Sequence, residues 1–589
     1  MTKQTRNLLI LFLTIFIIKA SISFLMSGTY FYSDEACVVI KAKHFAETLQ
    51  MLPCKDIAHA PGGDPHPLYS LIIAPFFFFF KGFTAYQAVL LFNSLAISSL
   101  VFPLYWISKN FVKKEWIAFL IITATLFLPQ ITIYEKMLLT ESFFVFLNIW
   151  LIYFYGKYKT EKKNTRKYLL LTFLFTIMTG LERPFGFITT FAIIVNEIIT
   201  AKNKKRVLLY LVPIFIIIGT FTFITLGNLW TKVLDLSFVF RNTENLKSLI
   251  VALKNQLNSL SISTLFIPIL TFTALFKNKK KPQLFQKIKW YLLTLFLTNF
   301  LISANHIYGY LITDKNTDLI TRYVNITIIL LYFFCFIFLL TKKRFEVSKE
   351  ETTIALICMV SLAFFHSQTI KHSLNLDLSP FYEKEGKNIG NLISQNKIMD
   401  LFFFPTMIFL TSLLIFGKRK ILVPTFILLI FIWGNYVYYW NIAYSKNLNK
   451  NHEDKMHFRN TEKHITILQE DKYRVVNFLL WDLMTLTNNK TEIFYLDTYK
   501  GLYSKINFYN EKSKNQFKNT DYIFTNIELP LPKIKSFENT MKIFYPPQGE
   551  NYEEHLEILR SENKPFIEPQ DTKTLPATSN PQENDKQQS

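Results

Sequence analysis

The sequence predicts an all-α polytopic membrane protein with about thirteen transmembrane helices, followed by a soluble α/β domain. Half of the 589 residues are hydrophobic, and 60 of them are Phe. Apolar runs of about 15 to 22 residues recur from Leu8 to Trp440, which is the length needed to cross a hydrocarbon core roughly 30 Å thick. Short clusters of Lys and Arg separate these runs, as in loops that orient a membrane protein.

The positive charge is spread along the chain. A formal net charge of +22 would suit a nucleic-acid partner if it formed one patch, but its dispersal between apolar runs excludes that reading. Such clusters are expected on the cytoplasmic side. Beyond the basic N-terminal tip, they are Lys109–Lys114, Lys157–Lys167, Lys202–Arg206, Lys277–Lys289, Lys342–Lys349 and Lys418–Lys420.

Placing every basic cluster inside requires an odd number of spans, so the chain is expected to end outside. The localisation predicted is the plasma (inner) membrane, with many passes. The predicted spans are residues 8–26, 85–107, 116–134, 142–156, 168–180, 187–201, 206–226, 260–276, 289–304, 324–341, 352–366, 400–416 and 421–440.

One apolar segment, residues 67–80, is not counted as a span. It is about 14 residues long and carries Pro75, which favours a helix at the membrane interface. Counting it as a span would put the basic cluster 109–114 outside, so residues 27–84 are expected to form a long external first loop. Lys19, inside the first span, is expected to face the helix bundle or to reach the interface.

Residues 1–440 are predicted to form the transmembrane catalytic domain and residues 441–561 an external α/β domain. In the second segment the apolar runs shorten to strand length, at residues 474–480, 493–496 and 522–525. Residues 562–589 are rich in Pro, Asn, Gln and Lys and are expected to be disordered.

Two of the four cysteines, Cys37 and Cys54, share the external first loop. An oxidising exterior permits a disulfide between them, and the sequence leaves open whether it forms. Cys335 and Cys358 lie in predicted helices and are expected to be packing residues.

The adjacent carboxylates Asp34 and Glu35 follow the first span and are the leading candidates for chemistry. One carboxylate can take a proton from a hydroxyl while the other holds a divalent cation. A solvated pair of loop acids is the alternative.

Further polar residues are expected on the same outer face. Asp64 and His66 stand where the first loop re-enters the interface, and the prolines on either side of His66 restrict its backbone. Glu141 begins the fourth span at the membrane level expected for Asp34. The alternatives are a simple turn at His66 and a helix-dipole partner at Glu141.

Two arginines also lie in predicted outer turns. Arg183 falls in a turn fixed by Pro and Gly between residues 180 and 186, and Arg322 opens the tenth span. Arginine suits phosphate because its planar fork donates two parallel hydrogen bonds. Either residue is alternatively an interfacial anchor.

These residues resemble the GT-C glycosyltransferases, in particular the branch that holds protein O-mannosyltransferases and the lipid A aminoarabinose transferase. Residues 33–36 look like the first-loop acidic motif of that family, residues 64–69 its His-Pro-Pro-Leu or Lys-Pro-Pro-Leu motif, and residues 138–144 its second acidic motif. Arg322 with Tyr323 falls where many bacterial members carry Arg-Tyr. The resemblance covers residues 1–330 well and the rest by architecture.

Two departures from the family pattern bear on the site. Glu141 stands where the aminoarabinose transferase has Asp, and His66 lacks the doubled proline that follows the matching residue in the family. The fit of His66 is therefore weaker than the fit of Asp34.

The resemblance implies an inverting glycosyltransferase that moves a sugar from a polyprenyl-phosphate donor to an acceptor hydroxyl on the external face. Asp34 would take the acceptor proton, and Glu35 with Glu141 would position a divalent metal cation. His66 and Arg322 would neutralise the departing lipid phosphate. Expected partners are the donor lipid, membrane lipids and a glycan, lipid or protein acceptor, with no nucleic acid.

Two other classes of function stay open. An O-antigen polymerase or ligase would carry one large late loop with basic residues in place of an early acidic pair. A transporter or flippase would have ionisable residues inside several spans and an internal repeat. The concentration of polar residues in the first loop and the 134–141 turn favours the transferase.

Overall fold

The structure is a computed structural model of the 589-residue chain. It describes residues 2–26, 33–51, 67–80, 82–138, 140–183, 186–201, 282–314 and 325–341, the strands given below and short helical pieces at 252–253, 268, 271–272, 421 and 423–428. Within these ranges, the side chains of residues 33–36, 82–83, 133, 187, 302 and 304–314 and of the strands are not described. The chain divides into two compact units, one of Met1–Ile57 and Gly62–Asp454 and one of Ala58–Pro61 and Lys455–Ser589.

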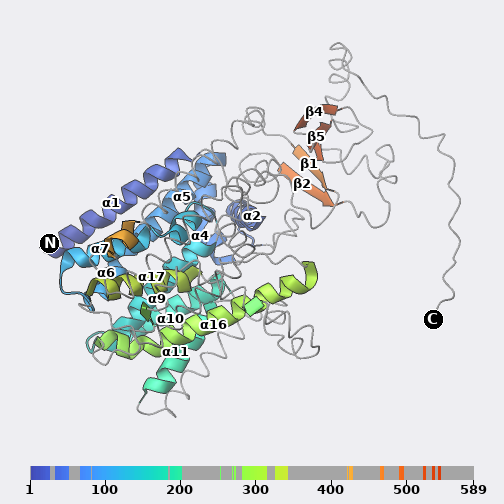
Figure 1. The fold of residues 1–589 in the computed structure, drawn as a ribbon. Coiled ribbons are helices and arrows are strands. Elements are labelled where there is room, and N and C mark those ends of the chain that lie inside the picture. Colours follow the sequence, from blue (N-terminus) through green and yellow to red (C-terminus); the bar gives the residue numbers. More distant parts are fainter. Residues whose placement is uncertain are drawn as a thin grey trace, which may run out of the picture. The chain divides into compact units, whose positions relative to one another are not determined.

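The described part of the first unit is all helical (Figure 1). Its helices are α1 (Lys3–Leu25), α2 (Ser33–Thr48), α4 (Pro67–Phe79), α5 (Gly82–Ser99), α6 (Val101–Lys109), α7 (Glu115–Leu126), α8 (Pro129–Tyr134), α9 (Thr140–Thr160), α10 (Thr165–Glu182), α11 (Gly186–Thr200), α16 (Gln283–Asp314) and α17 (Asn325–Thr341).

Five helices lie close to predicted spans, namely α1, α9, α10, α11 and α17. The predicted span 116–134 is two helices, α7 and α8, because Pro129 begins a new helix and lacks the N–H needed to continue the preceding one. The predicted span 85–107 is α5 followed by α6. Two described helical segments, Lys3–Leu25 and Thr84–Lys109, are long and apolar enough to cross a membrane.

Other predicted spans differ from the structure or lie beyond it. The span 289–304 is part of the longer α16, which has 32 residues. The predicted spans 206–226, 352–366 and 400–416 lie outside the described residues, and those at 260–276 and 421–440 are described in short pieces. The total of thirteen stays a prediction. The expected interface segment at residues 67–80 is helical as α4, with Pro75 inside the helix.

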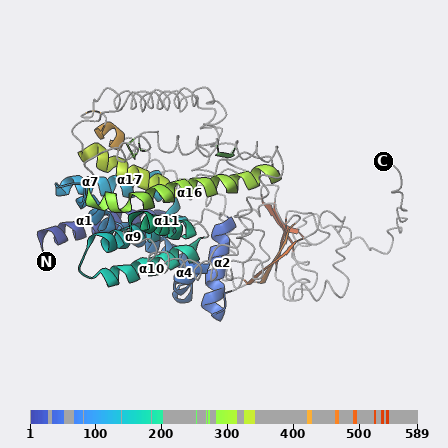
Figure 2. The same ribbon diagram turned by 90° about the horizontal axis from the view of Figure 1, so that it is seen from below.

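Helix α9 is central to the helical unit. It packs against α5, α6, α8, α10, α16 and α17, and most of its side chains are buried (Figures 1 and 2). Side chains of neighbouring helices approach the α9 backbone closely at Gly156, where a Cβ would lie 3.0 Å from side-chain atoms of Trp106 and Leu284. The side chains of α17 are buried from Asn325 through Leu339, so α17 lies within the bundle.

The described part of the second unit is a five-stranded sheet of β1 (His464–Gln469), β2 (Lys490–Tyr495), β3 (Tyr522–Thr525), β4 (Lys533–Phe537) and β5 (Met541–Phe544). The strand order is β2-β1-β3-β5-β4. Strand β1 pairs in parallel with β2 and β3, and β5 is antiparallel to β3 and β4. Parallel pairs require crossover connections, as in an α/β domain.

Strands expected near residues 493–496 and 522–525 are present as β2 and β3. The strand expected at 474–480 and any helices of this unit lie outside the described residues. The predicted α/β character of the domain therefore stays a prediction.

Candidate functional site

Two of the predicted site residues, Glu141 and Arg183, have described side chains. Asp34 and Glu35 are described as backbone in the first turn of α2, so the pair begins a helix where the sequence suggested a loop. Asp64, His66 and Arg322 lie outside the described residues.

Glu141 and Arg183 form an ion pair. Nη2 of Arg183 donates to Oε1 of Glu141 at 2.7 Å, and the side chains are 11% and 1% exposed, respectively. The guanidinium also lies 5.9 Å from the centroid of the Phe144 ring, at a cation–π distance. Glu141 stands in the first turn of α9, where the helix dipole favours a negative charge. Burial makes this pair sensitive to the loss of either partner.

The sequence fixes the turn that carries Arg183. A residue before proline disfavours the helical conformation, and Arg183, which precedes Pro184, has extended backbone at φ −151° and ψ 147°. Its N–H donates to the Thr179 carbonyl at 3.2 Å. The N–H of Gly186 then donates to the Arg183 carbonyl at 2.8 Å. A Cβ on Gly186 would lie 1.9 Å from the Thr179 carbonyl oxygen, so this position requires glycine.

A second acid, Glu182, is buried beside this ion pair. Its side chain is fully buried, and neither carboxylate oxygen has a hydrogen bond of ordinary geometry among the described residues. It ends α10, beyond the predicted span 168–180. Burial raises the pKa of Glu182 well above its ordinary value, and the charge of Glu141 raises it further, against opposing effects of Arg183 and the Tyr69 backbone.

We call Tyr69, Glu141, Glu182 and Arg183 the Glu141 cluster. It joins the start of α4, the start of α9 and the end of α10, and α4 packs against α2, which carries Asp34 and Glu35. Neither Tyr69 nor Glu182 was predicted as a site residue. The available signals were that Tyr69 stands two residues after Pro67 and that Glu182 directly precedes Arg183.

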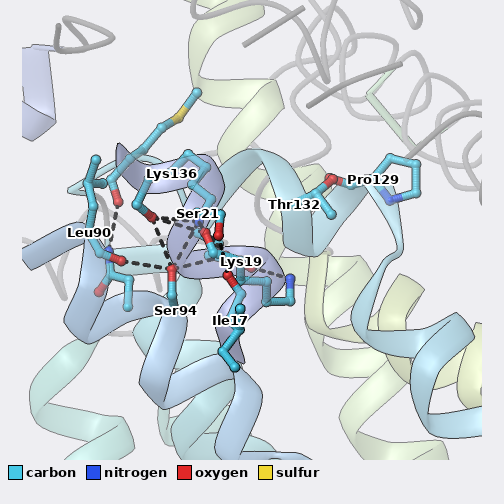
Figure 3. A network of polar contacts seen from close by, with 12 residues as sticks. Ile17, Lys19, Ser21, Leu90, Ser94, Pro129, Thr132 and Lys136 are labelled. Atoms are coloured by element: carbon cyan, nitrogen blue, oxygen red, sulfur yellow. Dashed lines mark hydrogen bonds and ion pairs between the residues drawn. The ribbon is translucent and has the colours of Figure 1, made fainter. Parts of the chain in front are cut away.

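A buried ionic network lies just before α9 (Figure 3). Nζ of Lys136 is 2.7 Å from Oε1 of Glu135 and donates to the Lys19 carbonyl at 2.8 Å, to Ser23 at 2.8 Å and to Ser94 at 2.9 Å. Lys19 pairs with the other carboxylate oxygen of Glu135. The three charged side chains are fully buried. Lys19 thus faces the bundle, which is one of the two positions predicted for it, and the network ties the turn 135–138 to α1 and α5.

Cys37, in α2, is disulfide-bonded, and Cys335 has a free, buried thiol. Cys54, the candidate partner of Cys37, lies outside the described residues. The packing role predicted for Cys335 is consistent with its full burial in α17.

The predicted divalent cation is untested by the described side chains. No group of three or more His, Cys, Asp or Glu side chains that could hold a metal occurs among them, and the side chains of Asp34 and Glu35 are not described. Glu141 and Glu182 supply carboxylate oxygens, which hard cations prefer. Arg183 occupies one oxygen of Glu141, so a cation bound there would share that carboxylate with the guanidinium.

No protein-family model matches the sequence, and neither does any curated protein. Solved structures do match. The apo structure of ArnT from Cupriavidus metallidurans matches with a TM-score of 0.50 and 10% identity, over 92% of this chain and 98% of that chain. The structure of the same ArnT bound to undecaprenyl phosphate matches with a TM-score of 0.49 and 10% identity, over 91% of this chain and 97% of that chain. An archaeal oligosaccharyltransferase, AglB from Archaeoglobus fulgidus, matches with a TM-score of 0.42 and 9% identity, over 88% of this chain and 70% of that chain.

The first of these matches extends over nearly the whole length of both chains, although the sequences have diverged to 10% identity. At that identity the match is evidence for the fold alone. The match agrees with the family resemblance of the sequence motifs. ArnT is the lipid A aminoarabinose transferase, a GT-C glycosyltransferase, and this chain has its fold.

Proposed function

We propose that this protein is an inverting membrane glycosyltransferase. It transfers a sugar from a polyprenyl-phosphate donor to an acceptor hydroxyl on the external face of the plasma membrane. The observation that carries the proposal is the Glu141–Arg183 ion pair, which places a predicted acid and a predicted phosphate-competent arginine side by side in a chain with the ArnT fold. That ArnT has also been crystallised with undecaprenyl phosphate, a lipid of the proposed donor class.

In the proposed reaction, the acceptor oxygen attacks the anomeric carbon of the sugar while the bond from that carbon to the phosphate oxygen breaks. The bonding electrons leave with the lipid phosphate, and the acceptor proton passes to Asp34. Attack opposite the leaving group inverts the anomeric centre. Phosphate is a fair leaving group, so the protein's main work is placement and charge stabilisation.

The remaining predicted residues bind and orient the substrates. Asp64, His66 and Arg322 contact the donor, and His66 with Arg322 neutralises the phosphate as it leaves. Arg183 is the second candidate for the phosphate. Its contact with Glu141 fixes the guanidinium before substrate arrives, which lowers the entropy lost on binding.

A divalent cation, when bound, would be held by Glu35 and Glu141 and would supply positive charge next to the phosphate. Oxygen ligands of this kind suit Mg²⁺, Mn²⁺ or Ca²⁺.

The experiment is a comparison of envelope lipids, glycans and proteins by mass spectrometry in wild-type and deletion strains. We expect a product that carries one sugar more in the wild type than in the deletion strain. Plasmid-borne wild-type protein should restore it, whereas Asp34→Asn, at equal protein level in the membrane, should not. Restoration by Asp34→Asn would remove the catalytic role of Asp34, and the absence of a mass difference would contradict the proposed function.

A further inference from the structure

A chain of buried hydrogen bonds joins α4 to the turn before α9. The hydroxyl of Tyr69 donates to Oδ1 of Asn93 at 2.8 Å, and Nδ2 of Asn93 donates to the Met137 carbonyl at 3.2 Å. Tyr69 and Met137 are fully buried, and Asn93, in α5, is 2% exposed. Asn93 therefore connects a side chain of α4 to the main chain four residues before Glu141.

The same turn of α4 also contacts α9 and α2. The Tyr69 ring stacks on Phe143 with 5.7 Å between centroids, two residues after Glu141. The hydroxyl of Ser70 donates to the Val38 carbonyl at 3.2 Å, and Val38 lies one helical turn after Asp34. One turn of α4 thus links the helix that carries the first acidic pair to both sides of Glu141.

The buried ionic network also holds the turn 135–138, through bonds from Lys136 to α1 and to Ser94 of α5. Lys136 draws this turn toward α1 and α5, while Asn93 holds the Met137 carbonyl. Buried polar groups that are fully hydrogen-bonded specify one arrangement, because any displacement leaves a donor or acceptor unsatisfied. These bonds therefore help to fix the position of Glu141 relative to α2, and Asn93 makes two of them.

We propose that Tyr69 and Asn93 are positioning residues. They hold the first turn of α2, which carries Asp34 and Glu35, at a set distance from Glu141. Neither residue needs to touch substrate for this role. The inference rests on the proposed function for its catalytic meaning, and the hydrogen-bond chain itself is testable without any substrate.

The test uses Tyr69→Phe, Asn93→Leu and the double variant in the full-length protein. The matched control is Tyr155→Phe, which removes the hydroxyl of another buried tyrosine, bonded to Glu197 at 2.7 Å near the other end of α9. The activity readout is the rate of sugar transfer in membranes of the deletion strain, with sugar-carrying polyprenyl-phosphate lipids extracted from the parent strain as donor.

Each single variant is expected to lower the maximal rate about tenfold. The loss of one buried hydrogen bond should raise the activation free energy by about the net value of that bond, because the acidic residues are then less well positioned. The double variant should also lose about tenfold, since both changes break the same chain. The half-saturating donor concentration should stay within about twofold of wild type. Tyr155→Phe should keep the wild-type rate. Additive losses near a hundredfold, or an unchanged rate in Tyr69→Phe, would overturn the proposal.

Hydrogen–deuterium exchange of the purified protein separates this inference from the proposed function. Tyr69→Phe should speed the exchange of amides in residues 135–142 and in α2, and Tyr155→Phe should not. If wild type transfers no sugar but these amides respond as expected, the proposed function fails and the positioning chain stands. If Asn93→Leu does not accumulate, the exchange of Tyr69→Phe alone decides, and an unchanged pattern refutes the chain.

Discussion

Arg183 donates from Nη2 to Oε1 of Glu141 across 2.7 Å, so the turn after α10 is bonded to the first turn of α9. The residues stand 42 positions apart in the sequence. The antiparallel packing of α9 and α10 around a short connection brings them together.

The first prediction concerns this pair. Arg183→Met leaves the buried Glu141 carboxylate without its guanidinium and is expected to destabilise the protein by about 3 kcal/mol. Glu141→Gln combined with Arg183→Met removes both charges and should recover about 0.5–3 kcal/mol of that loss. Chemical denaturation of the purified proteins in detergent measures the interaction. Equal loss in the single and double variants would contradict the pairing.

The second prediction concerns Gly186. A methyl group there would meet the Thr179 carbonyl, and backbone cannot yield as a flexible side chain can. Gly186→Ala should therefore displace the Arg183 turn and reduce sugar transfer at least tenfold. Gly156→Ala is the matched control, because its added methyl group meets side-chain atoms at 3.0 Å and these can shift. Equal transfer rates in the two variants would refute a special role for the turn.

The third prediction concerns Glu182. The pKa of its carboxyl is raised above 4.5 in the folded protein, so the folded state binds its proton more tightly than the unfolded state. The stability from this proton is fully present below about pH 4.5 and is lost as the pH rises through the raised pKa.

Glu182→Gln keeps the shape of the neutral carboxyl and cannot ionise. From pH 5 upward, the melting temperature of the wild type should therefore fall relative to that of Glu182→Gln. Parallel melting curves for the two proteins across this range would show that Glu182 is charged in the folded state.

The sequence predicted Glu141 and Arg183 as site residues because each follows or begins an apolar run. It did not predict their pairing, which depends on helix packing between distant positions. Glu182 was not predicted, because an acid next to an arginine in a turn is usually exposed to solvent. In the structure its side chain is buried. Helix α16 extends beyond the predicted span 289–304 at both ends, from Gln283 to Asp314. Polar residues such as Lys287 and Asn305 end the apolar run in the sequence without ending the helix.

The fourth prediction concerns sidedness, for which the positions of the basic clusters are the evidence. Reporter fusions near residues 160, 280 and 345 should be cytoplasmic, and fusions near 50, 240 and 500 external. An external reporter at 280 would break the odd count of spans and leave the second unit on the cytoplasmic side.

The last prediction concerns the balance of charge in the buried ionic network. Lys19 and Lys136 share the single carboxylate of Glu135, and all three side chains are fully buried. Glu135→Gln would leave two ammonium groups in the interior and should cost about 3–5 kcal/mol, enough to stop accumulation of the protein.

Lys19→Met should be tolerated far better, because it leaves Glu135 and Lys136 as a neutral pair that keeps its contacts with Ser23 and Ser94. The double variant Lys19→Met with Glu135→Gln leaves one unpaired ammonium and should fall between the two. The amount of folded protein in detergent extracts, followed by thermal unfolding, ranks the three. If Glu135→Gln proves as stable as Lys19→Met, the two lysines do not need the carboxylate. Water molecules or loss of a proton from one amine must then compensate for the missing negative charge.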